Sequence, residues 1–121
     1  MDMKVKRVEK KIRTSKDEVI KYQFLTHCFL NDIQISASDL QCLHALSVMG
    51  KVELTKFCET IALTGIFKSS QSCRNALSKA EKKGLVVKDG ENKKKIFINP
   101  KMEIEIEGII LLDYKILSFE S

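Results

Sequence analysis

The stretch from Ser69 to Pro100 decides the fold, and it reads SSQSCRNALSKAEKKGLVVKDGENKKKIFINP. Apolar residues recur in its first half at the spacing of one helix face: Cys73, Ala76, Leu77 and Ala80. Ser69 or Ser70 can cap the start of this helix, because a serine hydroxyl accepts a hydrogen bond from a free amide of the first turn. Gly84 ends the helix, since glycine adopts the left-handed conformation after a helix at little cost. The first half is therefore predicted to be a helix with one apolar and one polar face.

The second half of the stretch predicts two strands around a turn. Leu85–Val87 begins the first strand, and Asp89–Asn92 supplies residues that favour a turn. Lys95–Asn99 then reads as the returning strand, which Pro100 closes. The helix is thus followed by a small antiparallel pair.

This succession resembles the C-terminal half of winged helix-turn-helix domains. The residues that carry the resemblance are Ala76–Val86, the polar turn after them, and the strand Ile96–Ile98, within a stretch of about a third of the chain. The resemblance implies an α+β fold, with a core of three helices and a β-wing. It also implies that the third helix lies in the DNA major groove while the wing reaches flanking phosphates.

Under this resemblance, the polar face supplies candidate contacts to DNA. Arginine can bond guanine through two hydrogen bonds, and asparagine or glutamine can do the same with adenine. The base-contact candidates are Gln71, Arg74, Asn75 and Ser78. The phosphate-contact candidates are Lys68, Ser70, Lys79, Lys82, Lys88, Lys93, Lys94 and Lys95, with Ser69 and Ser72 as further hydroxyls. For Arg74 alone, a surface salt bridge, for instance with Glu81, is the open alternative.

The distribution of charge favours the same surface. The 121 residues carry a net charge of +5, and residues 68–95 hold nine basic and three acidic side chains. Residues 1–21 hold eight and four, whereas residues 22–67 hold two and four and residues 96–121 hold two and five. Positive charge therefore collects on the predicted helix and wing and on the N-terminal arm, as a phosphate-facing surface requires. The open alternative is that these lysines solvate exposed faces.

Two further helices are predicted before the stretch. A cap at Ser36 or Ser38 precedes an apolar face that runs from Leu40 to Met49, and Gly50 stops the helix. A second helix covers Glu53–Leu63. The distance from this helix to the next is longer than usual in winged helices. Either the second helix has an extra turn, or the loop Thr64–Lys68 is long.

Both ends of the chain predict strands. Lys4–Arg13 is a charged strand or an arm, and Val19–Leu30 reads as a strand, with a helix over Asp17–Leu30 as the open alternative. Met102–Glu107 alternates strictly, and Ile109–Phe119 continues as a second strand pair. We therefore divide the chain into an N-terminal basic arm or strand pair (1–35), a winged-helix core (36–100) and C-terminal strands (101–121). The last are expected to pack on the N-terminal segment or on a partner chain.

Catalytic and metal chemistry are not expected. The carboxylates of Glu103, Glu105 and Glu107 read as one solvated strand face, and no nucleophile or phosphate loop is recognisable. The four cysteines, Cys28, Cys42, Cys58 and Cys73, read as buried free thiols. A zinc site from His27, Cys28, Cys42 and His44 can be written down, but it lacks the close ligand pairs of zinc sites. We expect a non-enzymatic protein with no cofactor and no metal.

Two functions remain open on the sequence alone. The first is a DNA-binding regulator of transcription or replication that acts on double-stranded DNA. The second is an assembly or structural protein, such as a subunit of a phage virion, that uses the winged helix and the terminal strands for protein docking. The longest apolar run, Ile109–Leu112, is too short to span a membrane. We therefore expect an oligomer in the cytoplasm, or in the virion under the second reading, with no membrane partner.

Overall fold

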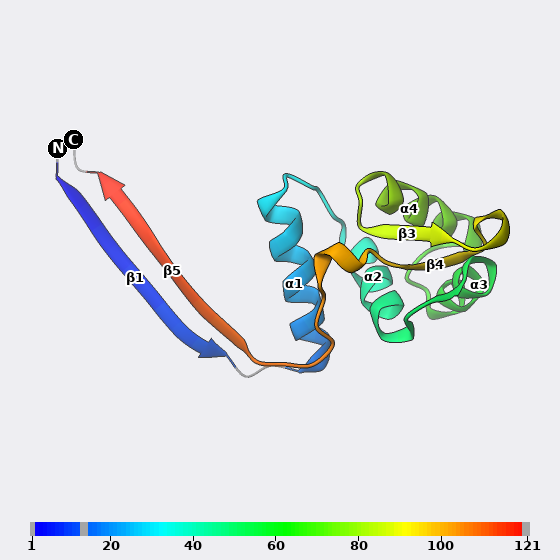
Figure 1. The fold of residues 1–121 in the computed structure, drawn as a ribbon, viewed down its shortest axis with the longest axis horizontal. Helices are drawn as coiled ribbons and strands as arrows, with labels where there is room; N and C mark the ends of the chain where they lie inside the picture. Colours follow the sequence, from blue (N-terminus) through cyan, green and yellow to red (C-terminus); the bar gives the residue numbers. More distant parts are fainter. Residues whose placement is uncertain (1, 13–14, 120–121) are drawn as a thin grey trace.

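The structure, a computed structural model, describes residues 2–12 and 15–119 and has a mixed α+β architecture (Figure 1). The helices are α1 (Lys16–Leu30), α2 (Ala37–Met49), α3 (Leu54–Thr64) and α4 (Ser70–Lys82), with 3-10 turns η1 (Glu91–Lys93) and η2 (Pro100–Met102). The strands are β1 (Met3–Ile12), β2 (Val52–Glu53), β3 (Val86–Asp89), β4 (Lys95–Ile98) and β5 (Ile110–Phe119). They form a two-stranded sheet, β1-β5, and a three-stranded sheet, β2-β4-β3. The predicted α+β class is confirmed.

Local signals place the predicted helices close to their expected bounds. At α2, the Ser36 hydroxyl accepts a hydrogen bond from the Asp39 amide, and the Asp39 carboxylate accepts one from the Ser36 amide. This reciprocal pair satisfies two amides that the helix itself leaves free. At α4, the cap is Ser69, whose hydroxyl accepts from the Ser72 amide at 3.1 Å. Of the two candidate caps for each helix, Ser36 caps α2 and Ser69 caps α4.

The three-stranded sheet contains the two strands that were predicted and one that was not. Strand β4 lies in the middle, with Lys88 of β3 opposite Ile96 and Val52 of β2 opposite the same residue. The very short β2 leads directly into α3, where the Leu54 amide donates to the Lys94 carbonyl at 2.7 Å. The sheet therefore ties the start of α3 to the turn of the β3–β4 hairpin (Val86–Ile98), here called the wing.

The prediction of a strand over Val19–Leu30 is wrong, because this segment is helix α1. Its cap is Ser15, whose hydroxyl accepts from the Glu18 amide. Ile20, Phe24 and Cys28, spaced by four residues, then lie on one side of the helix and enter the main apolar core. The helical spacing that the sequence left as an alternative is the one that forms, and the core extends N-terminal of Ser36.

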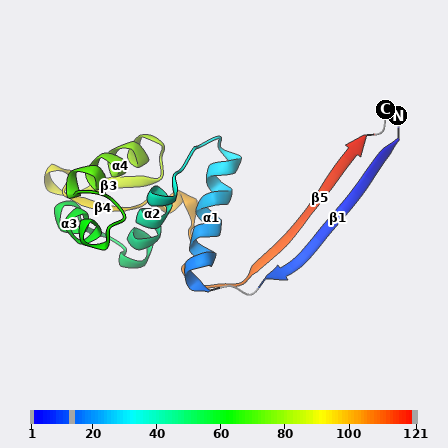
Figure 2. The ribbon, with the colours of Figure 1, turned by 180° about the vertical axis from the view of Figure 1, so that it is seen from behind.

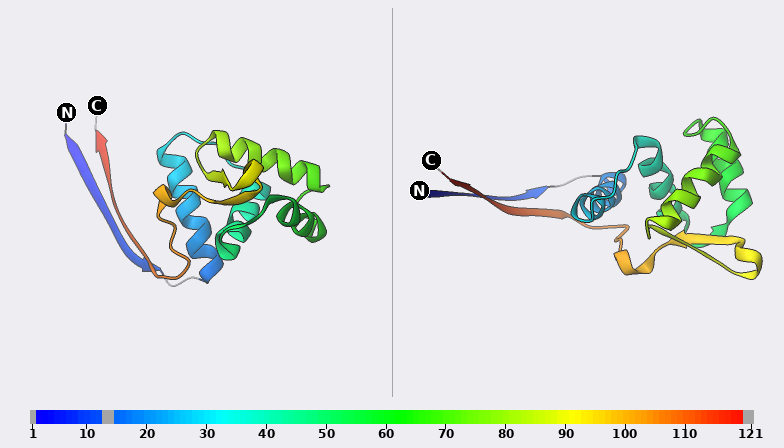
Figure 3. Two further views of the ribbon diagram at one scale, coloured as in Figure 1. Left: turned by 45° about the vertical axis from the view of Figure 1, so that its right-hand side comes forward. Right: turned by 90° about the horizontal axis from the view of Figure 1, so that it is seen from above.

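Strands β1 and β5 pair as a long antiparallel ribbon. Met3 lies opposite Phe119 at one end, and Ile12 lies opposite Ile110 at the other. The ribbon leaves the body near the N-terminal end of α1 and extends away from it (Figures 1 and 2). Two further directions show the same projection (Figure 3). The C-terminal strand therefore pairs with the N-terminal segment, which is one of the two expected arrangements.

The predicted strand over Met102–Glu107 is wrong, and only one of the two C-terminal strands forms. Residues after η2 run as irregular backbone up to β5. The side chain of Gln23 on α1 takes the role of a neighbouring strand there. Its amide nitrogen donates to the Glu105 carbonyl, and its oxygen accepts from the Glu105 amide, each at 2.7 Å.

The core lies between the helices and the three-stranded sheet. Its buried side chains come from all four helices and from β3 and β4. The four cysteines are buried free thiols, as predicted. Burial, with the neighbouring Cys73, raises the pKa of the Cys58 thiol to about 12. The hydrogen bond with Cys42, together with burial, raises the pKa of the Cys73 thiol further. The thiols of Cys58 and Cys73 therefore remain protonated and pack as small apolar groups.

Candidate nucleic-acid interface

Helix α4 turns a continuous polar face away from the core. Cys73, Leu77 and Ala80 are its buried residues. At about 100° per residue, the base-contact candidates Gln71, Asn75 and Ser78 and the lysine Lys82 fall within about 60° of arc on the opposite side. Gln71, Asn75 and Lys82 are exposed, and Ser78 is half-buried. The structure therefore brings three of the four base-contact candidates onto one face.

The two amide side chains on this face are bonded to each other. The Gln71 side-chain nitrogen donates to the Asn75 side-chain oxygen at 2.9 Å, one helical turn along α4. The bond fixes the orientation of both amides. It leaves the Gln71 oxygen and the Asn75 nitrogen directed elsewhere, so the pair still offers one acceptor and one donor group.

Arg74, the fourth base-contact candidate, lies at the margin of this face. Its guanidinium nitrogen Nη2 donates to the hydroxyl of Thr55 at 3.0 Å, which links α4 to the first turn of α3. The salt bridge with Glu81, which was the alternative prediction for Arg74, does not form. Instead, the Glu81 carboxylate lies 3.8 Å from Nζ of Lys88. In this structure Arg74 joins two helices, and its remaining guanidinium nitrogens keep their capacity to donate.

Lys88 lies at the junction of helix and wing. Its Nζ donates to the Ser78 hydroxyl at 3.3 Å, and its side chain is only 15% exposed. The ammonium therefore neutralises Glu81 and fixes β3 against α4. Among the phosphate-contact candidates, Lys88 is the one that the fold uses as a structural link.

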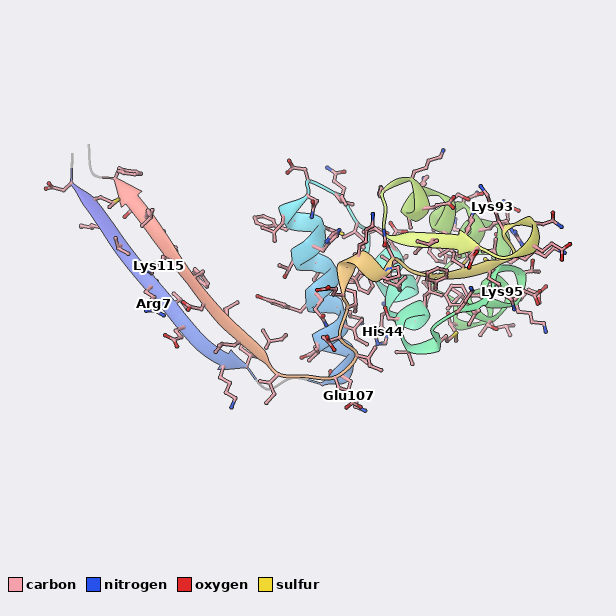
Figure 4. All side chains as sticks on the ribbon, viewed as in Figure 1. Arg7, His44, Lys93, Lys95, Glu107 and Lys115 are labelled. Atoms are coloured by element: carbon pink, nitrogen blue, oxygen red, sulfur yellow. The ribbon has the colours of Figure 1, made fainter. Side chains whose placement is uncertain are left out.

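The tip of the wing concentrates exposed lysines. Lys93 ends η1, Lys94 follows it, and Lys95 begins β4. All three are exposed, and Lys93 and Lys95 are labelled in Figure 4. Gly90, with φ of 84°, allows the chain to turn between β3 and β4, and a Cβ there would lie 3.1 Å from Cγ of Lys95. A residue with a side chain at this position would be strained in its backbone and crowded against the lysine. The tight turn therefore keeps the lysines together.

An ion pair near the tip of the wing removes one of its acidic charges. Nζ of Lys51 lies 2.7 Å from the Asp89 carboxylate and 5.2 Å from the centre of the Phe97 ring. The Lys51 hydrogen bond holds the pKa of the Asp89 carboxyl below its usual range. This pairing could not be predicted from the sequence, because Lys51 precedes α3 and Asp89 follows α4.

The remaining candidates lie at both ends of α4. Lys68 and Ser70 are exposed at its start, and Lys79 and Lys82 are exposed in its last turns. Ser69 and Ser72 are engaged in the cap, with their hydroxyl oxygens 3.1 Å apart. Exposed basic side chains thus lie at the start of α4, in its last turns and on the wing.

The zinc set considered from the sequence does not form. His44 pairs through Nε2 with the Asp17 carboxylate at 3.0 Å (labelled in Figure 4), and Cys28 and Cys42 are buried in the core. Over residues 2–12 and 15–119 there is no group of three or more metal-ligating side chains. Within the same residues, no helix combines the length and apolar character that crossing a bilayer requires.

Comparison of the chain with protein-family models, with curated proteins and with solved structures gives no match.

Proposed function

We propose that this protein binds double-stranded DNA as a winged helix-turn-helix, with α4 in the major groove and the wing on the phosphates. The observation that carries the proposal is the composition of the outward face of α4. It presents amides, hydroxyls and lysines, and the single carboxylate of the helix, Glu81, is paired with Lys88. A helix that meets base edges and phosphates needs donors and acceptors without unpaired negative charge.

The order of the elements supports the same proposal. Helices α2, α3 and α4 are followed by the hairpin β3–β4, with the short β2 between α2 and α3 as a third strand. The bond between Lys88 and Ser78 holds the hairpin beside the polar face of α4. The helix and the wing would therefore approach a duplex together, as the resemblance implies.

The candidate contacts divide into two groups with different consequences. Gln71 and Asn75, and Arg74 after release from Thr55, are suited to base edges. The exposed lysines at the helix ends and at the wing tip would bind phosphates, which fixes position and carries little sequence information. The proposed role is regulatory and not catalytic.

The test is the salt dependence of binding to duplex DNA, measured by fluorescence anisotropy. The logarithm of affinity should fall with the logarithm of salt concentration by about 0.9 for each phosphate neutralised. The double variant Lys93→Ala, Lys95→Ala should therefore lower the slope by up to about 1.8. A matched control with the same change in charge is Lys101→Ala, Lys115→Ala, which alters the two exposed lysines of the net acidic segment 96–121, outside α4 and the β3–β4 hairpin. Equal slopes for both doubles, or no binding at low salt, would refute the proposal.

A second candidate function is protein assembly, as in a structural subunit of a larger particle. The observation that favours it is the exposed β1–β5 ribbon, which carries apolar side chains on both faces and contributes none of the buried core residues. Retention in a large complex that is insensitive to salt, without any DNA binding, would favour this role over the first.

A further inference from the structure

The strand register gives the β1–β5 ribbon two distinct faces. Residues opposite each other in an antiparallel pair point to the same side, and the sides alternate along the strand. One side, here called the inner face, carries a mostly apolar row from β5 beside a row of apolar and lysine residues from β1. Its members are Ile110, Leu112, Tyr114, Ile116 and Ser118 of β5 with Ile12, Lys10, Val8, Lys6 and Lys4 of β1.

The ribbon is unprotected in a single chain. None of the twenty residues of β1 and β5 is buried. An isolated two-stranded ribbon in water is marginally stable, and exposed apolar strand surfaces associate. A stable ribbon of this length therefore requires another surface against it.

Helix α1 presents a matching surface. Besides the face that enters the core, it exposes a second apolar stripe, Tyr22, Leu25 and Phe29, at helical spacing. Where the ribbon leaves the body, Ile12 and Ile110 of the inner face and Tyr22 and Leu25 of the helix line one open groove of about 340 Å³. From there the ribbon and α1 diverge (Figures 1 and 2), so one chain leaves most of both surfaces uncovered.

The charges of the two regions are complementary. Residues 2–12 and 110–119 of the ribbon carry six basic and three acidic side chains, a net of +3. Beside α1, which is neutral overall with two basic and two acidic residues, the segment 103–108 adds three glutamates, a net of −3 for the two together. Gln23 holds this segment against α1 through its two bonds to Glu105. Lysines of the inner face would therefore meet carboxylates at the helix.

We propose that a second copy of this chain covers these surfaces, in a two-fold dimer in which the inner face of each ribbon and the α1 stripe of each copy are buried. When two complementary surfaces of one chain lie apart, a second copy related by a two-fold axis can bury both of them at once. A two-fold interface uses the same surfaces of both copies in this way. The ribbon is about 33 Å long, at about 3.3 Å per residue, and α1 is about 22 Å long. With a width of about 10 Å each, the two surfaces amount to about 550 Å² per copy and about 1,100 Å² in total, near the lower limit for specific interfaces. This inference is independent of DNA binding.

Sedimentation equilibrium of the full chain without DNA tests the proposal. The unmodified protein should be a dimer, and Ile116→Glu and Leu25→Glu should each raise the dissociation constant at least about 100-fold, because each buries an unpaired charge. The matched control on the ribbon is Leu117→Glu, one residue further along β5 on the opposite face, since Leu117 is 54% exposed and Ile116 is 47% exposed. The control on the body is Leu63→Glu, on α3, where the residue is 90% exposed. Both controls should remain dimeric.

A second measurement uses the unmodified protein and does not depend on the folding of any variant. Hydrogen exchange of the β1 and β5 amides should quicken on dilution below the dissociation constant, while the amides of α4 stay protected. A monomer at every concentration, an assembly larger than a dimer, or equal dissociation by Ile116→Glu and Leu117→Glu would overturn the proposal. So would ribbon protection that appears only when DNA is added, which would assign the ribbon to DNA.

Discussion

Replacement of Phe24 by alanine tests whether α1 belongs to the folded core. Phe24 is 0% exposed and packs within the main apolar cluster, whereas Phe29 on the same helix is 82% exposed. A buried aromatic side chain removes at least about 150 Å² from water, which at about 25 cal/mol per Å² is worth nearly 4 kcal/mol. The alanine keeps part of this area, but the cavity that remains adds a cost. We therefore expect Phe24→Ala to lower the free energy of unfolding by about 3–5 kcal/mol.

Phe29→Ala removes the same atoms from the same helix and is the matched control. With most of its ring in water, its loss should cost less than about 1 kcal/mol. Urea denaturation followed by circular dichroism measures both values, at several protein concentrations, because a contribution from self-association depends on concentration. Equal losses of unfolding free energy for the two replacements in the monomer would refute the placement of α1 in the core. The N-terminal segment would then be independent of the core, as the sequence-based division at residue 35 implied.

Two smaller perturbations follow from single contacts. Ser69→Ala removes the cap of α4 and should cost about 1 kcal/mol in urea denaturation, whereas Ser70→Ala, one residue inside the helix, should change stability by less than about 0.5 kcal/mol. The pKa of the Asp89 carboxyl, followed by carbon NMR, should lie below its usual range and return towards it in Lys51→Met. Because the pKa of Asp89 is depressed in the folded state, the Lys51 pairing stabilises the fold at pH values above the ordinary carboxyl pKa. This stabilisation is lost as the pH falls through the depressed pKa. An Asp89 pKa that is the same with and without Lys51 would refute this explanation.

The parts of the fold that the sequence predicted are those set by local chemistry. The start of α2 and the end of α4 depend on residues within four positions of each other, namely the Ser36–Asp39 pair and Gly84. The polar face of α4 was predicted for the same reason, since helical spacing alone separates Gln71 and Asn75 from the buried residues. Helix ends and helix faces could therefore be predicted, because they depend on residues close together in the chain.

The errors arise where the decisive partner is distant in sequence. Val19–Leu30 is rich in branched and aromatic residues, which favours a strand, yet its apolar residues also have helical spacing, and burial against α2 selects the helix. Met102–Glu107 alternates as a strand does, but a strand needs a hydrogen-bonding neighbour. The only neighbour described at Glu105 is the side chain of Gln23, which satisfies one residue and not a row. The alternation is a surface pattern there and not a sheet.

Hydrogen bonds that already exist on α4 affect which of its side chains are available for DNA bases. In the free protein, Arg74 is bonded to Thr55, and Gln71 is bonded to Asn75. A base contact with two hydrogen bonds draws on Nη2 of Arg74, the nitrogen that already donates to Thr55. Turning the guanidinium away from Thr55 gives up a bond worth about 0.5–1.5 kcal/mol, which offsets part of the about 1–3 kcal/mol that a good base contact supplies. The amide pair is different, because its free donor and acceptor can meet base edges while the internal bond stays intact. Sequence preference, if DNA binding holds, should therefore depend more on Gln71 and Asn75 than on the single arginine of the helix.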